Sequence, residues 1–168
     1  MSPLTKIAIS VMNECYLNEV ENIIFSSQYG ELQKLTELTE QYLCCNTVSP
    51  LGFTNSVHNT SAGAFTLLNK INQKYNAVSA GENSLSAGLI EAITEQKPSL
   101  ICCADAAKQD DFKGVALSLG KTDMHNSDCI EVTFETNPSY TDDFKQFIKF
   151  LDKDISTYTS KFLKLKRM

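Results

Sequence analysis

The chain has 168 residues, 42% of them hydrophobic and 21% charged, which is the composition of one soluble globular domain. Fifteen Lys and Arg stand against twenty Asp and Glu, giving a net charge of −5. This charge excludes nucleic acid as the main partner, because binding to phosphates requires clustered cations. No apolar run is long enough for a membrane span, and the apolar stretch near the N-terminus is too short for a signal peptide. We therefore expect a cytoplasmic protein.

The first half of the chain is predicted to be mainly helical. Its expected elements are a helix from Ser2-Pro3 to Met12, a strand within Val20–Ser27, a helix over Glu31–Leu43, a loop at Pro50–Gly52 and a helix over Asn55–Asn69. These assignments follow from apolar residues at helical spacing and from a short apolar run suited to a buried strand. The second helix carries an apolar stripe formed by Leu32, Leu35, Leu38 and Tyr42.

The second half alternates strands and helices. Its expected elements are a strand at Ala77–Ser79, a tight turn at Ala80–Ser84, a helix over Leu85–Gln96, strands at Ser99–Ala104, Gly114–Gly120 and Cys129–Phe134, and a helix from Thr141 to Phe162. This order is an α/β pattern with crossover helices. We expect a single domain over residues 1–168, with residues 141–168 as a C-terminal helical extension.

Six cysteines are present, and their spacing argues against disulfides and against a metal site. They form two adjacent pairs and two isolated residues, namely Cys44–Cys45, Cys102–Cys103, Cys15 and Cys129. No C-x-x-C occurs. Both pairs lie in apolar runs, where free cysteine behaves as a small buried hydrophobe. We therefore expect buried thiols in a reducing compartment, with no metal and no cofactor.

The turn at residues 80–84 carries the most chemical information in the sequence. A strand, tight turn and helix in this order form a nucleophile elbow, which lifts one side chain toward the positive end of the helix. In covalent catalysis the lifted residue is Ser or Cys, whereas here it is Glu82. A glutamate near a helix start is also favoured by the helix dipole alone, so its position does not by itself establish a site.

Several motifs with consistent spacing resemble the N-terminal half of the β-ketoacyl synthases. They are S-P-L-G-F-T-N-S-V-H-N within residues 49–59, A-V-S-A-G-E at 77–82 and G-L-I-E-A at 88–92, and S-S-Q-Y-G-E-L at 26–32 fits the first strand and turn. The resemblance extends to about Gly120. It is strongest to a small branch associated with ketosynthase systems that make aryl polyene lipids. It implies a thiolase-like half-fold with a mixed β-sheet and crossover helices, followed here by the long C-terminal helix.

The sequence departs from the catalytic members of this family at one decisive position. Their elbow ends in T-A-C, whose cysteine carries the acyl chain, and along this sequence that cysteine falls on Glu82. A carboxylate there cannot form the thioester. Active members also use two histidines from the second half of a longer fold, but His58 belongs to the S-V-H-N motif and His125 to a polar loop. We therefore expect no catalytic residue in this chain.

The resemblance implies a partner. Family members that lack the cysteine are known as chain-length factors, which pair with an active ketosynthase and close the tunnel in which the acyl chain grows. A full-length β-ketoacyl synthase is thus the expected partner, in polyene or polyketide (fatty-acid-like) biosynthesis. The candidate interface or tunnel residues are Phe53, Asn55, Val57, His58, Asn59 and Phe65. Phe53 and Phe65 also fit a place in the chain's own core.

Other interpretations remain open at this point. Glu82 has either a structural role at the start of its helix or a role in decarboxylation, although it would repel a malonyl carboxylate. The chain as a whole is alternatively a free-standing acyltransferase or malonyl decarboxylase using Glu82, or a module that binds acyl carrier protein. Residues 152–168 contain five basic and two acidic residues. This basic tail suits an acidic carrier protein or a membrane surface, and equally a helix with cations near its C-terminus.

Overall fold

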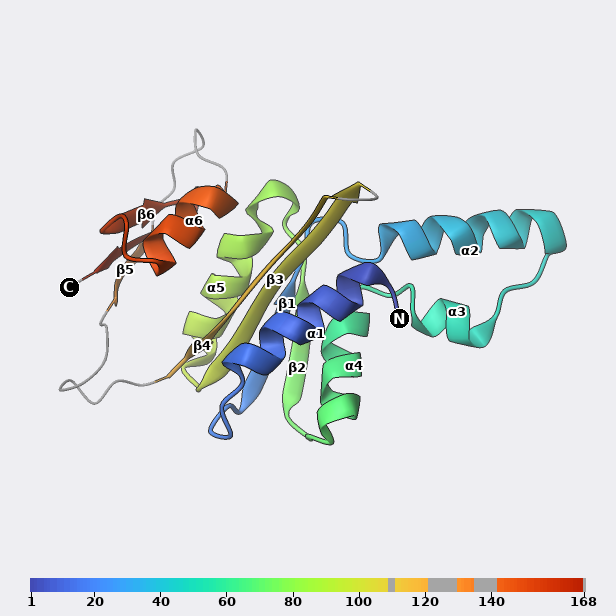
Figure 1. The fold of residues 1–168 in the computed structure, drawn as a ribbon, viewed down its shortest axis with the longest axis horizontal. Coiled ribbons are helices and arrows are strands. Elements are labelled where there is room, and N and C mark those ends of the chain that lie inside the picture. Colours follow the sequence, from blue (N-terminus) through green and yellow to red (C-terminus); the bar gives the residue numbers. More distant parts are fainter. Residues whose placement is uncertain (109–110, 121–129, 135–141, 168) are drawn as a thin grey trace.

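The computed structural model describes residues 1–108, 111–120, 130–134 and 142–167. Its elements are α1 (Pro3–Cys15), β1 (Asn22–Ser26), α2 (Leu32–Cys45), α3 (Pro50–Thr54), α4 (Thr60–Asn69), β2 (Lys74–Val78), the short 3-10 helix η1 (Gly81–Asn83), α5 (Ser84–Glu95), β3 (Ser99–Lys108), β4 (Asp111–Leu119), β5 (Ile130–Phe134), α6 (Phe144–Leu151), β6 (Thr157–Thr159) and β7 (Leu163–Arg167). Figure 1 shows a central sheet with helices, a C-terminal unit at one end and the helices α2 and α3 at the other.

The central sheet has the strand order β2-β1-β3-β4. β1 runs parallel to both of its neighbours, β2 and β3, whereas β4 pairs antiparallel with β3. Helices α1 and α4 cover one face and α5 covers the other (Figure 1). Every residue of β1 is buried, as expected for a strand covered on both faces. The predicted α/β class with a mixed sheet is therefore confirmed.

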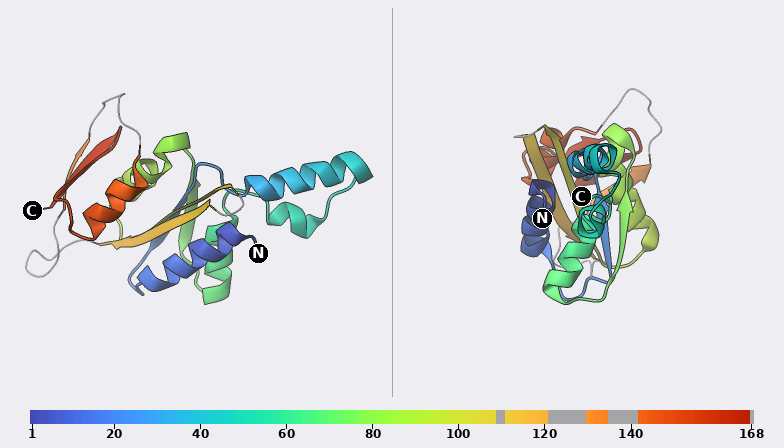
Figure 2. Two further views of the ribbon diagram at one scale, coloured as in Figure 1. Left: turned by 45° about the horizontal axis from the view of Figure 1, so that its top comes forward. Right: turned by 90° about the vertical axis from the view of Figure 1, so that its right-hand side faces the viewer.

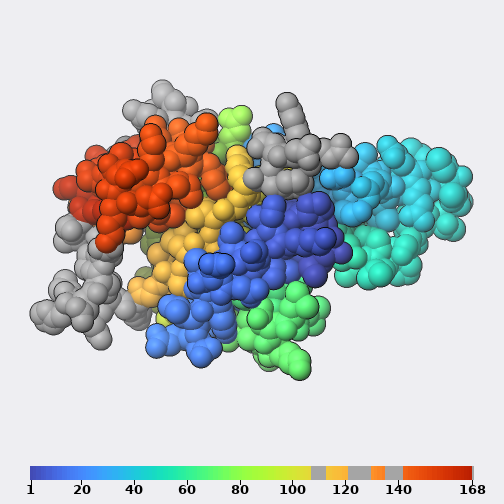
Figure 3. All heavy atoms as spheres, in the orientation of Figure 1, coloured from blue at the N-terminus to red at the C-terminus, as the bar shows by residue number. Residues whose placement is uncertain are grey.

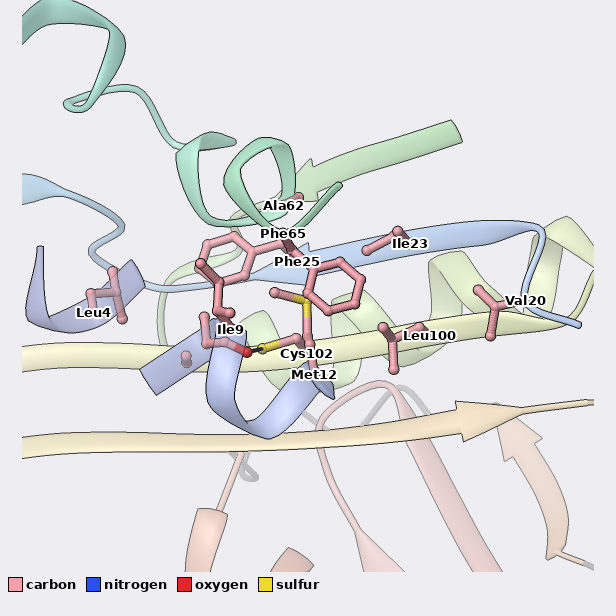
Figure 4. Packing of buried hydrophobic residues seen from close by; sticks show 12 residues of the cluster. Leu4, Ile9, Met12, Val20, Ile23, Phe25, Ala62, Phe65, Leu100 and Cys102 are labelled. Atoms are coloured by element: carbon pink, nitrogen blue, oxygen red, sulfur yellow. Dashed lines mark hydrogen bonds between the residues drawn. The ribbon is translucent and has the colours of Figure 1, made fainter. Parts of the chain in front are cut away.

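One of the two core clusters lies between α1, α4 and the sheet (Figure 4). Met12 of α1 and Phe65 of α4 are fully buried there together with Phe25 of β1. Helix α1 begins as predicted, because the side chain of its N-cap residue Ser2 accepts a hydrogen bond from the Thr5 amide at 3.0 Å. The apolar spacing that predicted this helix is thus the face that fills the core.

The C-terminal unit differs from the expected long helix. Helix α6 ends at Leu151, and the chain then forms β6 and β7, which build a separate three-stranded antiparallel sheet in the order β5-β7-β6. Lys153 adopts a positive φ of 67°, which stops the helix. Beyond it, the buried Leu163 and Leu165 alternate with lysines at a period of two, which is the period of a strand. The prediction of a helical extension is therefore wrong beyond Leu151.

Two further predictions need correction in the segment before the elbow. Residues 50–54 form α3 and not a loop, because Pro50 suits the first helical position and the Ser49 hydroxyl accepts a hydrogen bond from the Gly52 amide at 3.3 Å. The following helix begins only at Thr60.

Cys102 and Cys103 are buried as expected, but the other cysteine pair, at residues 44–45, is exposed. His125 and Cys129 lie outside the described residues.

Helices α2 and α3 form an arm, defined here as residues 32–54, that leaves the body of the molecule (Figures 1 and 2). Both helices lie in the described part of the chain, and neither contains a buried residue. The space-filling view in Figure 3 shows the arm projecting beyond the body. The exposed apolar residues of the arm are Leu32, Leu35, Tyr42, Leu43, Val48, Leu51 and Phe53.

The base of the arm is fixed by two buried carboxylates. Asp105 of β3 accepts hydrogen bonds from the backbone amides of Gln28 at 2.8 Å and Tyr29 at 3.0 Å. Glu31 accepts a hydrogen bond from the Ser2 hydroxyl at 2.6 Å. Charge-assisted hydrogen bonds of this kind hold a turn firmly. The arm is therefore anchored where it starts, although its helices lie outside the core.

None of the helices in the described ranges is long and apolar enough to cross a membrane.

Candidate functional site

The predicted elbow is present at the edge of the central sheet. It connects β2, which is an edge strand, to the first turn of α5. Gly81 has a positive φ of 59°, a conformation that glycine adopts at little cost. The Ser84 hydroxyl closes the turn, because it donates to the Gly81 carbonyl at 2.7 Å and accepts from the Ala80 amide at 3.1 Å. Local hydrogen bonds thus determine the shape of the elbow.

Glu82 is exposed at this elbow. Its carboxylate makes no hydrogen bond or ion pair with the described residues. A Cβ atom added at the neighbouring Gly81 would meet nothing within 4 Å, so the space beside the elbow is open. A capping hydrogen bond to α5, one of the two roles considered for Glu82, is therefore absent from the described contacts. The side chain is instead open to solvent.

Asp142 occupies the start of α5, which sequence reasoning did not anticipate. Its carboxylate accepts a hydrogen bond from the Ser86 amide at 2.7 Å, and it comes from the segment just before α6. Burial raises the pKa of the Asp142 carboxyl above its ordinary value, and the hydrogen bond from Ser86 opposes this rise. Asp142 therefore links the C-terminal unit to the N-terminus of α5. Its distance of 56 residues from Ser86 in sequence explains why no local motif signals it.

The buried cysteines of β3 are not nucleophiles. Burial raises the pKa of the Cys103 thiol to about 12 and places that of Cys102 well above its ordinary value. The thiolate is the reactive form of cysteine, so both side chains stay protonated at neutral pH. Burial also raises the pKa of the half-buried Cys15. None of these thiols lies at the elbow.

His58 makes structural contacts beside the elbow. Its Nε2 atom lies 3.2 Å from the carbonyl oxygen of Val78, the last residue of β2, and its ring centroid is 5.9 Å from that of Phe25. A Cβ atom at Gly30 would approach its Nδ1 atom to 2.4 Å, so the ring is closely packed against the base of the arm. His58 therefore ties the elbow strand to the arm.

The other candidate residues differ in how far they are buried. Phe65 is fully buried and stacks edge-to-face with Tyr16 at a centroid distance of 5.7 Å, so it fills the chain's own core. Phe53 is 58% exposed and takes no part in that core. Asn59 is exposed, and Asn55 and Val57 are half-buried.

Exposed apolar residues also occur beside the edge strand β2, at its end away from the elbow. Tyr75 of β2 is exposed, as are Leu67 and Leu68 on helix α4, which packs beside it. The elbow and the base of the arm are adjacent, because the Ser27 amide donates to the Val78 carbonyl at 3.2 Å. The apolar residues predicted on one face of α2 are therefore present at helical spacing, but none of them is buried in the chain's own core.

Comparison with known proteins identifies this architecture. A family model described as the N-terminal domain of β-ketoacyl synthase matches residues 1–116. The solved complex of the ketosynthase ApeO with its chain length factor ApeC, from Xenorhabdus doucetiae, superposes with a TM-score of 0.75 at 21% identity over 99% of this chain and 77% of that chain. The ishigamide ketosynthase/chain length factor superposes with a TM-score of 0.59 at 13% identity, over 80% of this chain and 49% of that chain.

A comparison with curated protein sequences finds no significant match. The solved structures share the fold, which is the thiolase-like ketosynthase fold expected from the motifs at residues 49–92. The family model covers more than half of the chain and includes the elbow. The chain therefore belongs to the β-ketoacyl synthase N-terminal domain family.

Proposed function

We propose that this chain is a non-catalytic chain-length factor that pairs with a full-length β-ketoacyl synthase and shapes the tunnel for the growing acyl chain. The observation that carries the proposal is the elbow itself. The motif resemblance aligns the acyl-carrying cysteine of the ketosynthases with this position, and the residue here is the exposed Glu82. A carboxylate forms no acyl thioester, so the condensation chemistry belongs to the partner.

The arm supports the existence of a partner. Leu43 is 77% exposed and Leu51 is 70% exposed, and both belong to one projecting pair of helices. Contiguous exposed apolar surface is the usual mark of a protein interface. The anchored base presents the arm in one position, so little conformational entropy is lost on binding.

The free edge of β2 extends this surface. β2 pairs with β1 on one side only, so its other edge offers backbone donors and acceptors to a second chain. The edge lies next to the elbow and to the exposed side chains of α4. A partner that covers the arm and this edge would therefore also approach Glu82.

The pathway and the carrier protein belong to the same proposal. One of the two solved structures is a ketosynthase in complex with its chain length factor, which supports a similar pairing here in aryl polyene or other polyketide synthesis in the cytoplasm. An acyl carrier protein would meet the basic tail, which is net positive. In the tail, Lys166 on β7 lies 3.9 Å from Glu131, and Lys161, in the turn between β6 and β7, lies over the Phe162 ring.

Co-expression with the ketosynthase encoded nearest to this chain tests the pairing. We expect the two proteins to co-elute in size-exclusion chromatography. The variants Leu43→Glu and Phe53→Glu place a charge in the interface and should lower the recovered complex at least tenfold. Leu17→Glu is a matched control, because Leu17 is 57% exposed but lies outside the arm. A stable monomer that never co-elutes, or equal losses in control and arm variants, would contradict the proposal.

Glu82→Ala and Glu82→Gln test the elbow within the same complex. Because Glu82 is exposed and makes no hydrogen bond or ion pair with the described residues, we expect both variants to fold and to show a change in partner affinity or in product length. Affinity is measured by titration of the ketosynthase and product length by mass spectrometry. Unchanged affinity together with unchanged product would remove Glu82 from the proposal and leave only the arm and the edge strand.

A further inference from the structure

Helices α1, α3 and α6 are capped by the residue that precedes each of them, whereas α5 is not. The N-cap residues of those three helices are Ser2, Ser49 and Asp143, whose side chains accept backbone amide hydrogen bonds and whose backbone is extended, with ψ of 161°, 128° and 104°. Asn83 precedes α5 with a ψ of 21° and makes no capping hydrogen bond. Asparagine is among the most favoured N-cap residues, so the sequence supplies a cap that this structure leaves unused.

Asp142 of the C-terminal unit takes the place of that cap. Its carboxylate accepts a hydrogen bond at 2.7 Å from the amide of Ser86, the third residue of α5. The Leu85 amide also favours the charged form of this carboxylate. These are the two amides that an N-cap side chain ordinarily binds. The Oδ1 atom of Asn83 is meanwhile buried without a hydrogen-bond partner among the described residues, which is unfavourable for an acceptor.

Asp142 is held in place by its own unit. The next residue, Asp143, caps α6 by accepting hydrogen bonds from two backbone amides of that helix at 2.9 Å and 3.1 Å. Tyr158 of β6 is fully buried and packs edge-to-face on Phe147 of α6, with the ring centroids 5.1 Å apart. Burial and the nearby Asp142 charge raise the pKa of the Tyr158 hydroxyl, so this hydroxyl stays protonated beside the carboxylate. The C-terminal unit therefore presents Asp142 to α5 in one position.

The backbone of Asn83 couples this cap to the elbow. To cap α5 itself, Asn83 would need the extended ψ of the other three caps, which turns the peptide unit between residues 83 and 84. The amide of that unit belongs to Ser84 and donates to the Gly81 carbonyl, a hydrogen bond that closes η1 around Glu82. Capping by Asn83 and the present shape of the elbow therefore exclude each other.

We propose that Asp142 is a positioning residue for the elbow. Its capping of α5 keeps Asn83 out of the cap and holds η1 closed. When Asp142 is withdrawn, Asn83 caps α5, η1 opens and the chain around Glu82 changes shape. The elbow thus has two arrangements, each with one capping side chain, and the docking of the C-terminal unit selects between them. The proposal concerns the isolated chain and holds whether or not the chain pairs with a ketosynthase.

A double-mutant cycle in urea unfolding tests the exchange of caps. In the wild type, Asn83→Ala removes an unpartnered acceptor and should leave the unfolding equilibrium constant unchanged or lower it. In the Asp142→Ala background, the same substitution removes the remaining cap and should raise that constant about fivefold, the factor expected for loss of an N-cap. Equal effects of Asn83→Ala in the two backgrounds would overturn the proposal.

Nuclear magnetic resonance of the isolated chain reads the backbone of the elbow directly. In Asp142→Ala, we expect the Gly81 and Glu82 amide resonances to shift and the Cα carbon resonance of Asn83 to move upfield, toward the value of extended backbone. Asp142→Asn should restore the wild-type positions, because its amide oxygen still accepts from Ser86. A contact that only adds stability would leave the Asn83 Cα resonance in place, so an unchanged resonance in folded Asp142→Ala would overturn the proposal.

Asp143→Ala is the matched control, because Asp143 is the neighbouring aspartate and caps α6 in the same way. We expect it to lower stability and to leave the elbow resonances in place. Equal movement of those resonances in Asp143→Ala would assign the effect to the C-terminal unit as a whole and overturn the role of Asp142. Asp142→Leu replaces Asp142→Ala if circular dichroism shows that the alanine variant does not fold, because leucine fills this half-buried position and accepts no hydrogen bond.

Discussion

The arm and the C-terminal unit are two additions to the same central sheet, and they use their apolar residues in opposite ways. In α6, Phe147 is 1% exposed and Phe150 is fully buried, because the unit packs on α5. In α2, the stripe of apolar residues contains no buried member, although it repeats at the same helical spacing. An amphipathic pattern therefore does not by itself show whether the apolar face of a helix is buried in its own chain.

The two regions also differ in how polar contacts hold them. The C-terminal unit reaches the N-terminus of α5 through Asp142, which binds the Ser86 amide. The arm is held where it leaves the body: Asp105 and Glu31 hold the turn before it, and the Thr60 hydroxyl donates to the carbonyl of Thr54, its last residue. The C-terminal unit is therefore packed into the fold, whereas the helices of the arm contribute no buried residue to it. The predictions below test this contrast.

The largest expected effect is on stability. Phe150→Ala removes a fully buried ring and should lower the free energy of unfolding by about 3–5 kcal/mol. Phe53→Ala in the arm removes an exposed ring and should change it by no more than about 0.5 kcal/mol. Urea unfolding followed by circular dichroism measures both. Similar decreases in the free energy of unfolding for the two variants would show that the arm is packed within the chain as the C-terminal unit is.

The second prediction concerns the cysteine pairs. Cys44 and Cys45 of the arm are exposed, so they should react with iodoacetamide in the native protein at least a hundredfold faster than the buried Cys102 and Cys103. Peptide mass spectrometry after timed alkylation gives both rates. Addition of the ketosynthase should protect the arm cysteines and leave the other pair unchanged. Equal rates for the two pairs in the free protein would contradict the exposed arm.

Local signals in the sequence predicted the central fold well. The Ser2 cap, the buried run of β1 and the elbow around Gly81 are each determined by neighbouring residues, and all three are present. The C-terminal strands were missed because phenylalanines at helical spacing in α6 are followed by a region whose period changes from helix to strand. Positive φ at Lys153 marks that change, and a lysine carries no signal for it.

The site was predictable only in part. The motif series predicted the elbow at residues 80–84, which the structure contains, and the place of Glu82 at the nucleophile position stays a prediction from the resemblance. The burial of Phe65 depends on the packing of α4 against α1 and the sheet, and the exposure of Phe53 depends on the position of the arm; no local pattern gives either. Asp142 was missed because its contact with Ser86 joins distant segments. Long-range packing therefore decides which of the predicted residues meet.

The smallest effect concerns the Asp142 contact and its dependence on pH. Because burial raises the pKa of Asp142 in the folded state, the folded chain holds this proton more tightly than the unfolded chain. The contribution of Asp142 to stability should therefore be greatest at low pH and should be lost as pH rises from about 4, the ordinary aspartate value, through the raised folded pKa. Asp142→Asn has no such proton, and its amide oxygen still accepts from Ser86.

The difference in the free energy of unfolding between the wild type and Asp142→Asn isolates this group, since all other carboxylates are common to both. We expect the difference to move in favour of the variant as pH rises from 4 to 7, measured by urea unfolding at each pH. Asp152→Asn is a control in the same unit, because Asp152 is exposed. A constant difference, or one that moves in favour of the wild type, would show that the carboxyl is well solvated and that Asp142 does not tie the C-terminal unit to α5.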